Sequence, residues 1–318
     1  MPQQTFAAVS VERYRTPTRR ERFLDEMNRV VPWIELVAVI EPVYPKAEGP
    51  GRPPVGVERM LRLHCLQQWF NLSDPAVEAA LSDSRVMRQF VGIDLGREPG
   101  PDERTLCQFR HLLEAPRLGE QLGAQIGAYL AAQGVPVSRG TIVDATLISA
   151  PRSTKNRTKK RDPEMPQTKK GNQWDFGMKA PIGVDSRTNV IHSVVATAAN
   201  VQDSQGLPQR LHGQDTRIWG EAAYSGPRDV LQPYAPDARS FIQAKAHRHR
   251  PLSEEDRAKN RTKSEVRAKV EQAFLVIKRI FGWANVRYRG REKTTNGLFV
   301  TCGLAHLSVA RRRVLVGP

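Results

Sequence analysis

Three carboxylates in this sequence lie at positions suited to holding metal ions. Asp144 lies inside Thr141–Ile148, an apolar and β-branched run that predicts a strand. Glu221 ends the short run Arg217–Glu221, and Glu271 belongs to a helical segment further on. Mg²⁺ prefers oxygen ligands, and two such ions about 4 Å apart activate an attacking oxygen and stabilise a leaving one. The three acids therefore predict metal-dependent chemistry at phosphate, with Mn²⁺ as the alternative ion and without a histidine or covalent nucleophile.

Each acid, taken singly, also has a structural explanation. Asp144 is explained by an ion pair with a lysine at a strand end, and Glu221 by the ordinary polarity of strand ends. Glu271 is explained by a surface pair with Arg267, which is worth only roughly a few tenths of a kcal/mol. It is the combination of the three that favours a metal site.

The helical segment, predicted from about Thr262 to Phe281, has two distinct faces. At about 100° per residue, Arg267, Glu271 and Lys278 share a strip about 40° wide. The strip borders an apolar stripe that should face the core, made of Val266, Val270, Phe274, Ile277 and Phe281. We therefore expect Glu271 to bind metal while Arg267 and Lys278 hold phosphates.

Short strands and the long helix must position these groups. We predict strands at Thr141–Ile148, Phe176–Val184, Val190–Ala196, Arg217–Glu221 and Ser240–Gln243. Together with the helix, they predict an α/β catalytic domain over residues 136–318, in which a mixed sheet is flanked by helices.

Residues 1–135 are instead predicted to form an all-helical domain. One helix starts at Thr16–Thr18, another covers Val57–Trp69, and a third follows Pro101–Asp102. Asp74 followed by Pro75 predicts a further helix with Asp74 as its N-cap. Short helices joined by tight turns favour a helix-turn-helix-like domain for DNA binding or dimerisation, and a plain helical bundle is the alternative.

The charge balance indicates a polyanionic partner. Forty-nine Lys and Arg against 33 Asp and Glu give a net charge of +16 and a pI near 10.2. Nucleic acid is the first partner that such an excess suggests, with binding that weakens as salt rises. Ribosomal and RNA-modifying proteins share this feature, so the charge alone does not decide the function.

A basic insertion interrupts the predicted strands at about residues 152–173. It holds eight basic and two acidic residues and almost no apolar side chains, so we expect it to be mobile by itself. It is either a solvated loop or an arm that orders on DNA phosphates, and we favour the arm. Its predicted DNA-binding residues are Lys155, Arg157, Lys159, Lys160, Arg161, Lys169 and Lys170.

Several other classes of protein are disfavoured by the sequence. Three cysteines do not make a disulfide framework, and the pairs Cys107/His111 and Cys302/His306 lack the usual spacing of zinc ligands. No run of about 18 apolar residues indicates a membrane span, and the first 15 residues do not resemble a signal peptide. We expect a cytoplasmic, nucleoid-associated protein.

The motifs taken together resemble those of the DDE transposases of the bacterial "insertion sequence five" family. The helix signature of that family, Y-(2)-R-(3)-E-(6)-K, is similar to Arg267, Glu271 and Lys278 at the same spacings. Other similar stretches, within a resemblance that covers about residues 15–310, are Thr141–Thr146, Phe176–Ala180, Gly183–Asp185, Val266–Gly282 and Val286–Gly290.

This resemblance implies a ribonuclease-H-like catalytic domain and a transposase activity. The enzyme would bind the terminal inverted repeats of double-stranded DNA, cut them and join them to target DNA, as a homodimer or a larger assembly. Two Mg²⁺ ions would be held by Asp144, Glu221 and Glu271, while Arg267 and Lys278 position phosphates.

Three positions differ from the pattern of the family. Glu221 stands where the family usually has Asp, and Ser264 stands at the tyrosine of the helix signature. Where many relatives read K-A-H-I-G-V-D, this chain has Pro181 between Ala180 and Ile182. These differences motivate a second hypothesis, a catalytically impaired DNA-binding protein derived from a transposase. A third hypothesis is a metal-dependent nuclease on a similar fold.

Overall fold

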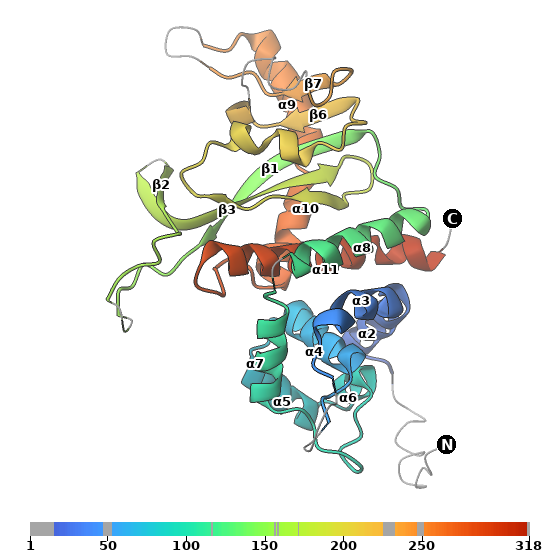
Figure 1. The fold of residues 1–318 in the computed structure, drawn as a ribbon. Coiled ribbons are helices and arrows are strands. Elements are labelled where there is room, and N and C mark those ends of the chain that lie inside the picture. Colours follow the sequence, from blue (N-terminus) through green and yellow to red (C-terminus); the bar gives the residue numbers. More distant parts are fainter. Residues whose placement is uncertain are drawn as a thin grey trace.

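The computed structural model describes residues 16–46, 53–115, 117–155, 157, 159–170, 172–224, 233–246 and 251–316. A group of helices lies on one side of the molecule and a sheet with its own helices lies on the other (Figure 1). The helices of the first group are α2 (Arg19–Val30), α3 (Trp33–Ile40), α4 (Val57–Phe70), α5 (Asp74–Asp83), α6 (Arg85–Val91) and α7 (Glu103–Leu112). Those of the second are α9 (Glu254–Arg267), α10 (Val270–Leu275) and α11 (Arg291–Val316), with α8 (Leu118–Ala132) beside α11.

Local sequence explains where the first helices begin. Thr18 caps α2 in a capping box, because its hydroxyl accepts from the Glu21 N–H while the Glu21 carboxylate accepts from the Thr18 N–H. The predicted cap of α5 was wrong by one residue. Ser73 is the N-cap, and Asp74 lies inside the helix, where it accepts a 2.8 Å bond from Arg110 on α7.

The apolar faces predicted for the helical part are buried. They form one continuous core with the residues that cover the sheet. The buried residues of these helices include Met27, Val30, Val31, Leu61, Cys65, Trp69, Val77, Leu81, Leu106 and Phe109.

The sheet is mixed, as predicted. Its strands are β1 (Gly140–Ser149), β2 (Gln167–Lys170), β3 (Gln173–Asp185), β4 (Ile191–Val194), β5 (Thr197–Ala198), β6 (Arg217–Gly220) and β7 (Arg239–Ile242). The strand order is β2-β3-β1-β6-β7, and β4 and β5 pair with β3. β3 is antiparallel to β1, whereas β1, β6 and β7 are parallel to one another. Each predicted strand is therefore present, with ends that differ by a few residues.

Pro181 lies inside β3, at a place that tolerates a missing N–H. The Pro181 carbonyl accepts from the Val195 N–H, so the backbone of this residue points away from β1 and toward the β4–β5 side. Val195 lies between β4 and β5, where the edge strand is interrupted. A proline here removes no bond of the β1–β3 ladder.

The predicted helix over about 262–281 differs from the one observed. α9 begins earlier, at Glu254, and ends at Arg267, and two turn residues separate it from α10. A π-helical turn, Val276–Ile280, then follows. Such irregular turns within a helix are common at functional sites. The predicted apolar stripe is nevertheless confirmed, since Val270, Phe274, Ile277 and Phe281 are buried and Val266 packs on the core.

The insertion at 152–173 is more ordered than we predicted. Its second half contains β2, which forms a hairpin with the start of β3. The Asp162 carboxylate accepts from the Gly290 N–H at 2.7 Å, and the Glu164 carboxylate accepts from the Arg291 N–H at 2.9 Å. Met165 is buried. These acids therefore contact backbone donors near the start of α11, and one apolar side chain of the insertion reaches the core.

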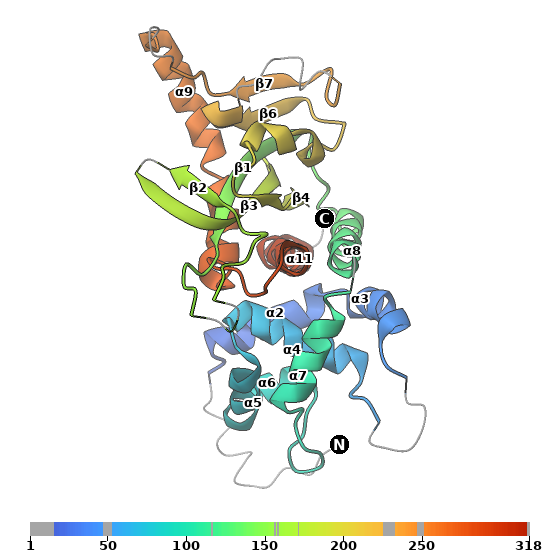
Figure 2. The ribbon, with the colours of Figure 1, turned by 60° about the vertical axis from the view of Figure 1, so that its left-hand side comes forward.

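α8 and α11 lie side by side in both ribbon views, between the sheet and the group of helices α2–α7 (Figures 1 and 2). Small residues permit their close approach. A Cβ at Gly119 would lie 2.3 Å from the Asn296 carbonyl oxygen, and one at Gly303 would lie 2.9 Å from a methyl of Ile126. The Asn296 amide group also accepts from the Gly119 N–H at 2.6 Å.

Replacing Gly177 by alanine should destabilise the fold. Gly177 has φ +152°, and a Cβ there would lie 2.1 Å from the backbone oxygen of Ile148 on β1. We expect Gly177→Ala to lower the free energy of unfolding by about 2–4 kcal/mol, measured by urea denaturation. Gly127→Ala on α8 is the matched control. Nothing lies within 4 Å of its added methyl, so it should be neutral or stabilising by about 1 kcal/mol. Equal stability of the two variants would contradict this account of Gly177.

Candidate active site

The register of two parallel strands brings Asp144 and Glu221 together. Ile142 on β1 pairs with Trp219 on β6, and each acid lies two residues beyond its partner of that pair. Side chains two residues apart point to the same face of a sheet, and neighbouring strands lie about 4.8 Å apart. The two carboxylates therefore occupy equivalent positions on neighbouring strands, with Asp144 in the middle of β1 and Glu221 just after the end of β6.

A single guanidinium nitrogen is shared by these two acids. Arg267 Nη1 donates to Asp144 Oδ2 at 2.8 Å and to Glu221 Oε1 at 2.6 Å. Arg267 is the last residue of α9, so the contact with these two acids is made where the helix ends. The Nε of Arg267 is buried and has no hydrogen-bond partner in the described structure. The arginine predicted to hold phosphate is thus an ion-pair partner of the acids in this structure.

Asp144 is the most buried of the three predicted acids. Only 6% of the residue is exposed, and burial raises the pKa of its carboxyl group to about 6. The negative charges of Glu221 and Glu271 raise this pKa further, while the Ala145 N–H and Arg267 oppose the increase. The raised pKa shows that the surroundings of Asp144 hold too little positive charge to offset its burial.

The two cations of the predicted strip contact β1, one before and one after Glu271 in the sequence. Arg267, four residues earlier, bonds Asp144, and Lys278, seven residues later, donates to the Thr146 hydroxyl at 3.1 Å. Asp144 and Thr146 share one face of β1. Arg267 and Lys278 of the predicted strip therefore contact this strand, whereas Glu271 is exposed.

Sequence reasoning assigned no role to Thr146, although the residue belongs to the strand motif that carries Asp144. The Lys278 ammonium group donates to the Thr146 hydroxyl and to the Leu147 carbonyl oxygen, each at 3.1 Å. Its position two residues after Asp144 was the only available signal, since i and i+2 share a face of a strand.

Ser264, at the tyrosine position of the helix signature, makes its own contact with the sheet. The Gln243 side chain, just beyond β7, donates to the Ser264 hydroxyl at 2.6 Å. The same hydroxyl donates to the Asn260 carbonyl oxygen at 2.9 Å. This difference from the signature is accommodated without disturbing α9.

The predicted DNA-binding lysines and arginines lie on the insertion, apart from the acids. Lys155, Arg157, Lys159, Lys160, Arg161 and Lys169 are all exposed on the surface. Arg161 stacks over the Phe176 ring at 4.1 Å, and Lys169 lies 5.6 Å from the Trp174 ring. Lys170 belongs to β2, and its side chain lies outside the described part.

The donor chemistry of the acids fits Mg²⁺, although the three groups do not surround a common point. No group of three or more His, Cys, Asp or Glu within the described ranges is placed to hold a metal ion. Oxygens of Asp144 and Glu221 already share one cation, the Arg267 guanidinium, as a metal ion would require of them. The carboxylates are therefore ligands of the kind that Mg²⁺ prefers, and in this structure the Arg267 guanidinium lies between two of them.

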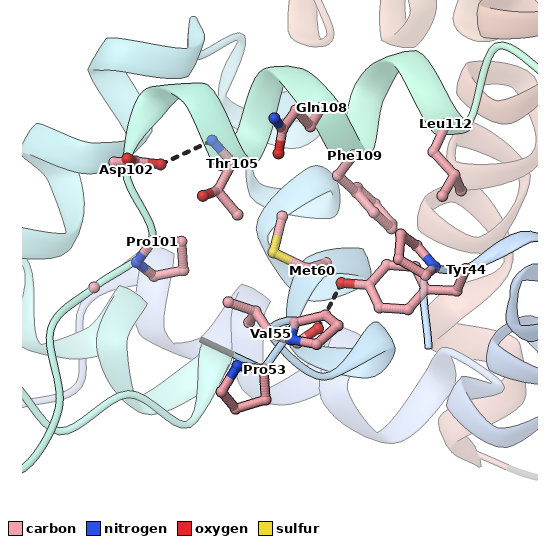
Figure 3. A pocket seen from close by; sticks show the side chains of 13 residues that line it. Tyr44, Pro53, Val55, Met60, Pro101, Asp102, Thr105, Gln108, Phe109 and Leu112 are labelled. Atoms are coloured by element: carbon pink, nitrogen blue, oxygen red, sulfur yellow. Dashed lines mark hydrogen bonds between the residues drawn. The ribbon is translucent and has the colours of Figure 1, made fainter. Parts of the chain in front are cut away.

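A cavity of about 380 Å³ in the helical part is separate from this site (Figure 3). Its lining includes Tyr44, Met60 and Phe109 and several prolines. The one acid in the lining, Asp102, is already engaged as the N-cap of α7, where it accepts from the Thr105 N–H at 2.8 Å. This cavity contributes nothing to the carboxylate chemistry.

Comparison with known families identifies the class of protein. A family model described as the transposase DDE domain matches residues 136–306, which include all three predicted acids, and a second, described as a transposase domain, matches residues 12–112. The chain therefore belongs to the family of transposase DDE domains, whose members act in DNA transposition and recombination within mobile elements. No solved structure matches the chain. None of the helices in the described ranges is long and apolar enough to cross a membrane.

Replacing Asp144 by asparagine should stabilise the metal-free protein above neutral pH. The folded protein binds the Asp144 proton more tightly than the unfolded chain, because its pKa is about 6 rather than 3.8. This contribution to stability is full below about pH 4 and is lost as the pH rises through 6. Asparagine does not ionise, so we expect Asp144→Asn to be more stable at pH 8 by on the order of 2–3 kcal/mol.

The measurement is urea denaturation in EDTA at pH 5 and pH 8. The advantage of Asp144→Asn should shrink at the lower pH. Asp25→Asn, which changes an exposed acid on α2, should show no such dependence. A variant of Asp144 that is less stable than the wild type at pH 8 would overturn our view of this carboxylate.

Proposed function

We propose that this chain is an active transposase of an insertion sequence, of the "insertion sequence five" kind. It binds the terminal inverted repeats, cuts the DNA and joins the ends to a target. The observation that carries the proposal is the meeting of Asp144 and Glu221 at matched positions of two parallel strands, where both accept hydrogen bonds from one arginine of the helix that leads to Glu271.

A ribonuclease-H-like fold for the catalytic part is supported by the sheet. From β4 to β3 to β1 the neighbours are antiparallel, and from β1 to β6 to β7 they are parallel. Figure 1 places α9 and α10 behind these strands, with α10 crossing β1. We propose residues 136–318 as the catalytic domain and 1–135 as the helical DNA-binding or dimerisation domain, with α8 packed on α11 of the catalytic part.

The acids Asp144, Glu221 and Glu271 would hold Mg²⁺, with Mn²⁺ as a substitute. When bound, two such ions activate the attacking water or 3′-hydroxyl and stabilise the leaving oxygen. The residues of the chain do the rest. The buried strand position of Asp144 fixes its carboxylate, and Lys278, held against Thr146 and Leu147, keeps the helix strip against β1.

Arg267 has two roles in this proposal. In the metal-free protein it balances the charge of the two acids that it bonds. With a metal ion held by those carboxylates, the guanidinium would be available to a phosphate of the DNA, for which its planar donors are well suited. The basic insertion and the net charge of +16 supply the long-range attraction to DNA.

The proposal extends to assembly and location. Two inverted repeats must be held at once for both ends of an element to be joined, so we propose a homodimer or larger complex on DNA. We also propose a cytoplasmic protein associated with the nucleoid.

Glu271→Gln tests the catalytic assignment. The amide keeps the size of the side chain and removes its charge, so DNA binding should persist. Strand transfer should fall by more than roughly 100-fold, the loss already reached when only an outer partner of a metal ligand is removed. The readout is joining of a labelled duplex, carrying the DNA that flanks the gene, to a plasmid target.

Glu265→Gln is the matched control for this variant. Glu265 is an exposed acid on α9, outside the predicted strip, and its replacement should leave transfer unchanged. Full transfer by Glu271→Gln would remove Glu271 from the site.

The second candidate function is DNA binding without catalysis. It is favoured by Glu221, one methylene longer than the aspartate of the family, and by the arginine between the acids. About 1 Å of misplacement costs about 10²-fold in rate. Retention of DNA on gels without metal-dependent cutting would support it, and cutting restored by Glu221→Asp would trace the defect to this position.

A further inference from the structure

We propose that Trp174 is a base-stacking residue, one that contacts an unstacked base of the bound DNA about seven or eight base pairs from the cut. This inference rests on the proposed transposase function. It concerns a residue outside the carboxylate site, at the tip of the β2–β3 hairpin.

The exposure of Trp174 is the first observation. Half of the residue (50%) is exposed, although large aromatic side chains normally bury most of their surface. Trp174 pairs across the hairpin with Lys169, whose ammonium group lies 5.6 Å from the ring. In both ribbon views this hairpin stands at the margin of the sheet (Figures 1 and 2).

A second aromatic ring in the same hairpin, in contrast, is covered by a cation. Phe176, two residues along β3, shares a strand face with Trp174, and its ring is covered by the Arg161 guanidinium at 4.1 Å. Trp174 keeps an open surface beside its lysine. An exposed aromatic face next to cations is the arrangement on which proteins stack nucleic-acid bases.

The charge around the hairpin selects a polyanion as the partner. Each acid of this region is already engaged, Asp175 by Arg152 at 2.6 Å and Asp162 and Glu164 by backbone donors near the start of α11. The basic residues of the insertion therefore outnumber the free acids, which favours a phosphate backbone over an apolar protein surface. Contacts with the phosphate backbone make no use of an exposed indole, whereas stacking on a base does.

The distance between Trp174 and the carboxylate site can be estimated from the number of residues along β3. Ile182 on β3 pairs with Asp144, and Trp174 lies eight residues before it on the same strand. At about 3.3 Å per residue this is about 25 Å. DNA that runs from the acids along β3 advances about 3.4 Å per base pair, so the ring would meet a base about seven or eight pairs from the scissile phosphate.

The test combines protein and DNA variants. Wild-type protein, Trp174→Ala, Trp174→Phe and Tyr234→Ala are titrated with the duplex that flanks the gene, intact or carrying one abasic site at successive positions. Tyr234 is the control because it is equally exposed, at 51%, and shortly precedes β7, which lies at the opposite end of the strand order from β2. Nicking by the wild type maps the cut on the same duplexes.

We expect Trp174→Ala to weaken binding to the intact duplex roughly tenfold. The loss should disappear when the abasic site is seven or eight pairs from the cut, because the contacted base is then already absent. Trp174→Phe should retain most of the affinity, and Tyr234→Ala should behave like the wild type on every duplex.

Three outcomes would overturn the inference. Trp174→Ala could bind every duplex as well as the wild type, it could lose the same affinity on all of them, or it could change only the oligomeric state in sedimentation, which would assign the indole to a second copy. In each case nicking by the wild type would leave the proposed function standing. Failure of the wild type to bind or nick any duplex would overturn the proposed function and this inference together.

Discussion

A metal site in this chain requires several negatively charged carboxylates close together. In the metal-free protein, the Arg267 guanidinium offsets the repulsion between them. Two unit charges 4 Å apart near a protein surface repel by about 4 kcal/mol. Arg267 Nη1 bonds an oxygen of both Asp144 and Glu221, so the repulsion between these acids is offset within the fold. The compensation is incomplete, because the pKa of Asp144 is still raised to about 6 by its burial. The site thus retains a deficit of positive charge.

The rest of the catalytic part is arranged around this requirement. Parallel pairing of β1 with β6 sets the two acids at equal depth, and the end of α9 places Arg267 between them. The chain then breaks its helical geometry at residues 268–269 and again in the π-helical turn. These breaks let Arg267 and Lys278 both reach β1 while the apolar stripe stays in the core.

Much of this arrangement could be predicted from periodicity and residue type. The strand around Asp144, the short strand before Glu221 and the buried stripe from Val270 to Phe281 follow from local patterns, and all are present. The Arg267–Asp144 pair could not be predicted from local patterns. The two residues are 123 positions apart in the sequence, and only the tertiary structure brings them together.

The insertion shows a different limit of sequence analysis. Its composition predicts mobility by itself. Composition carries no information about tertiary contacts, such as those of Asp162 and Glu164 with backbone donors near α11 or the burial of Met165. The N-cap of α5 was similarly misassigned, since Ser73 and Asp74 are both good capping residues and only the partner on α7 decides between them.

The claim that three distant segments form one metal site is tested most directly by iron-directed cleavage of the protein. Fe²⁺ replaces Mg²⁺, ascorbate and peroxide generate radicals at the bound ion, and mass spectrometry maps the broken backbone. We predict cuts near Asp144, Glu221 and Glu271 together, suppressed by excess Mg²⁺ and absent in Asp144→Asn. Cuts confined to one of these segments, or unaffected by Mg²⁺, would contradict a shared site.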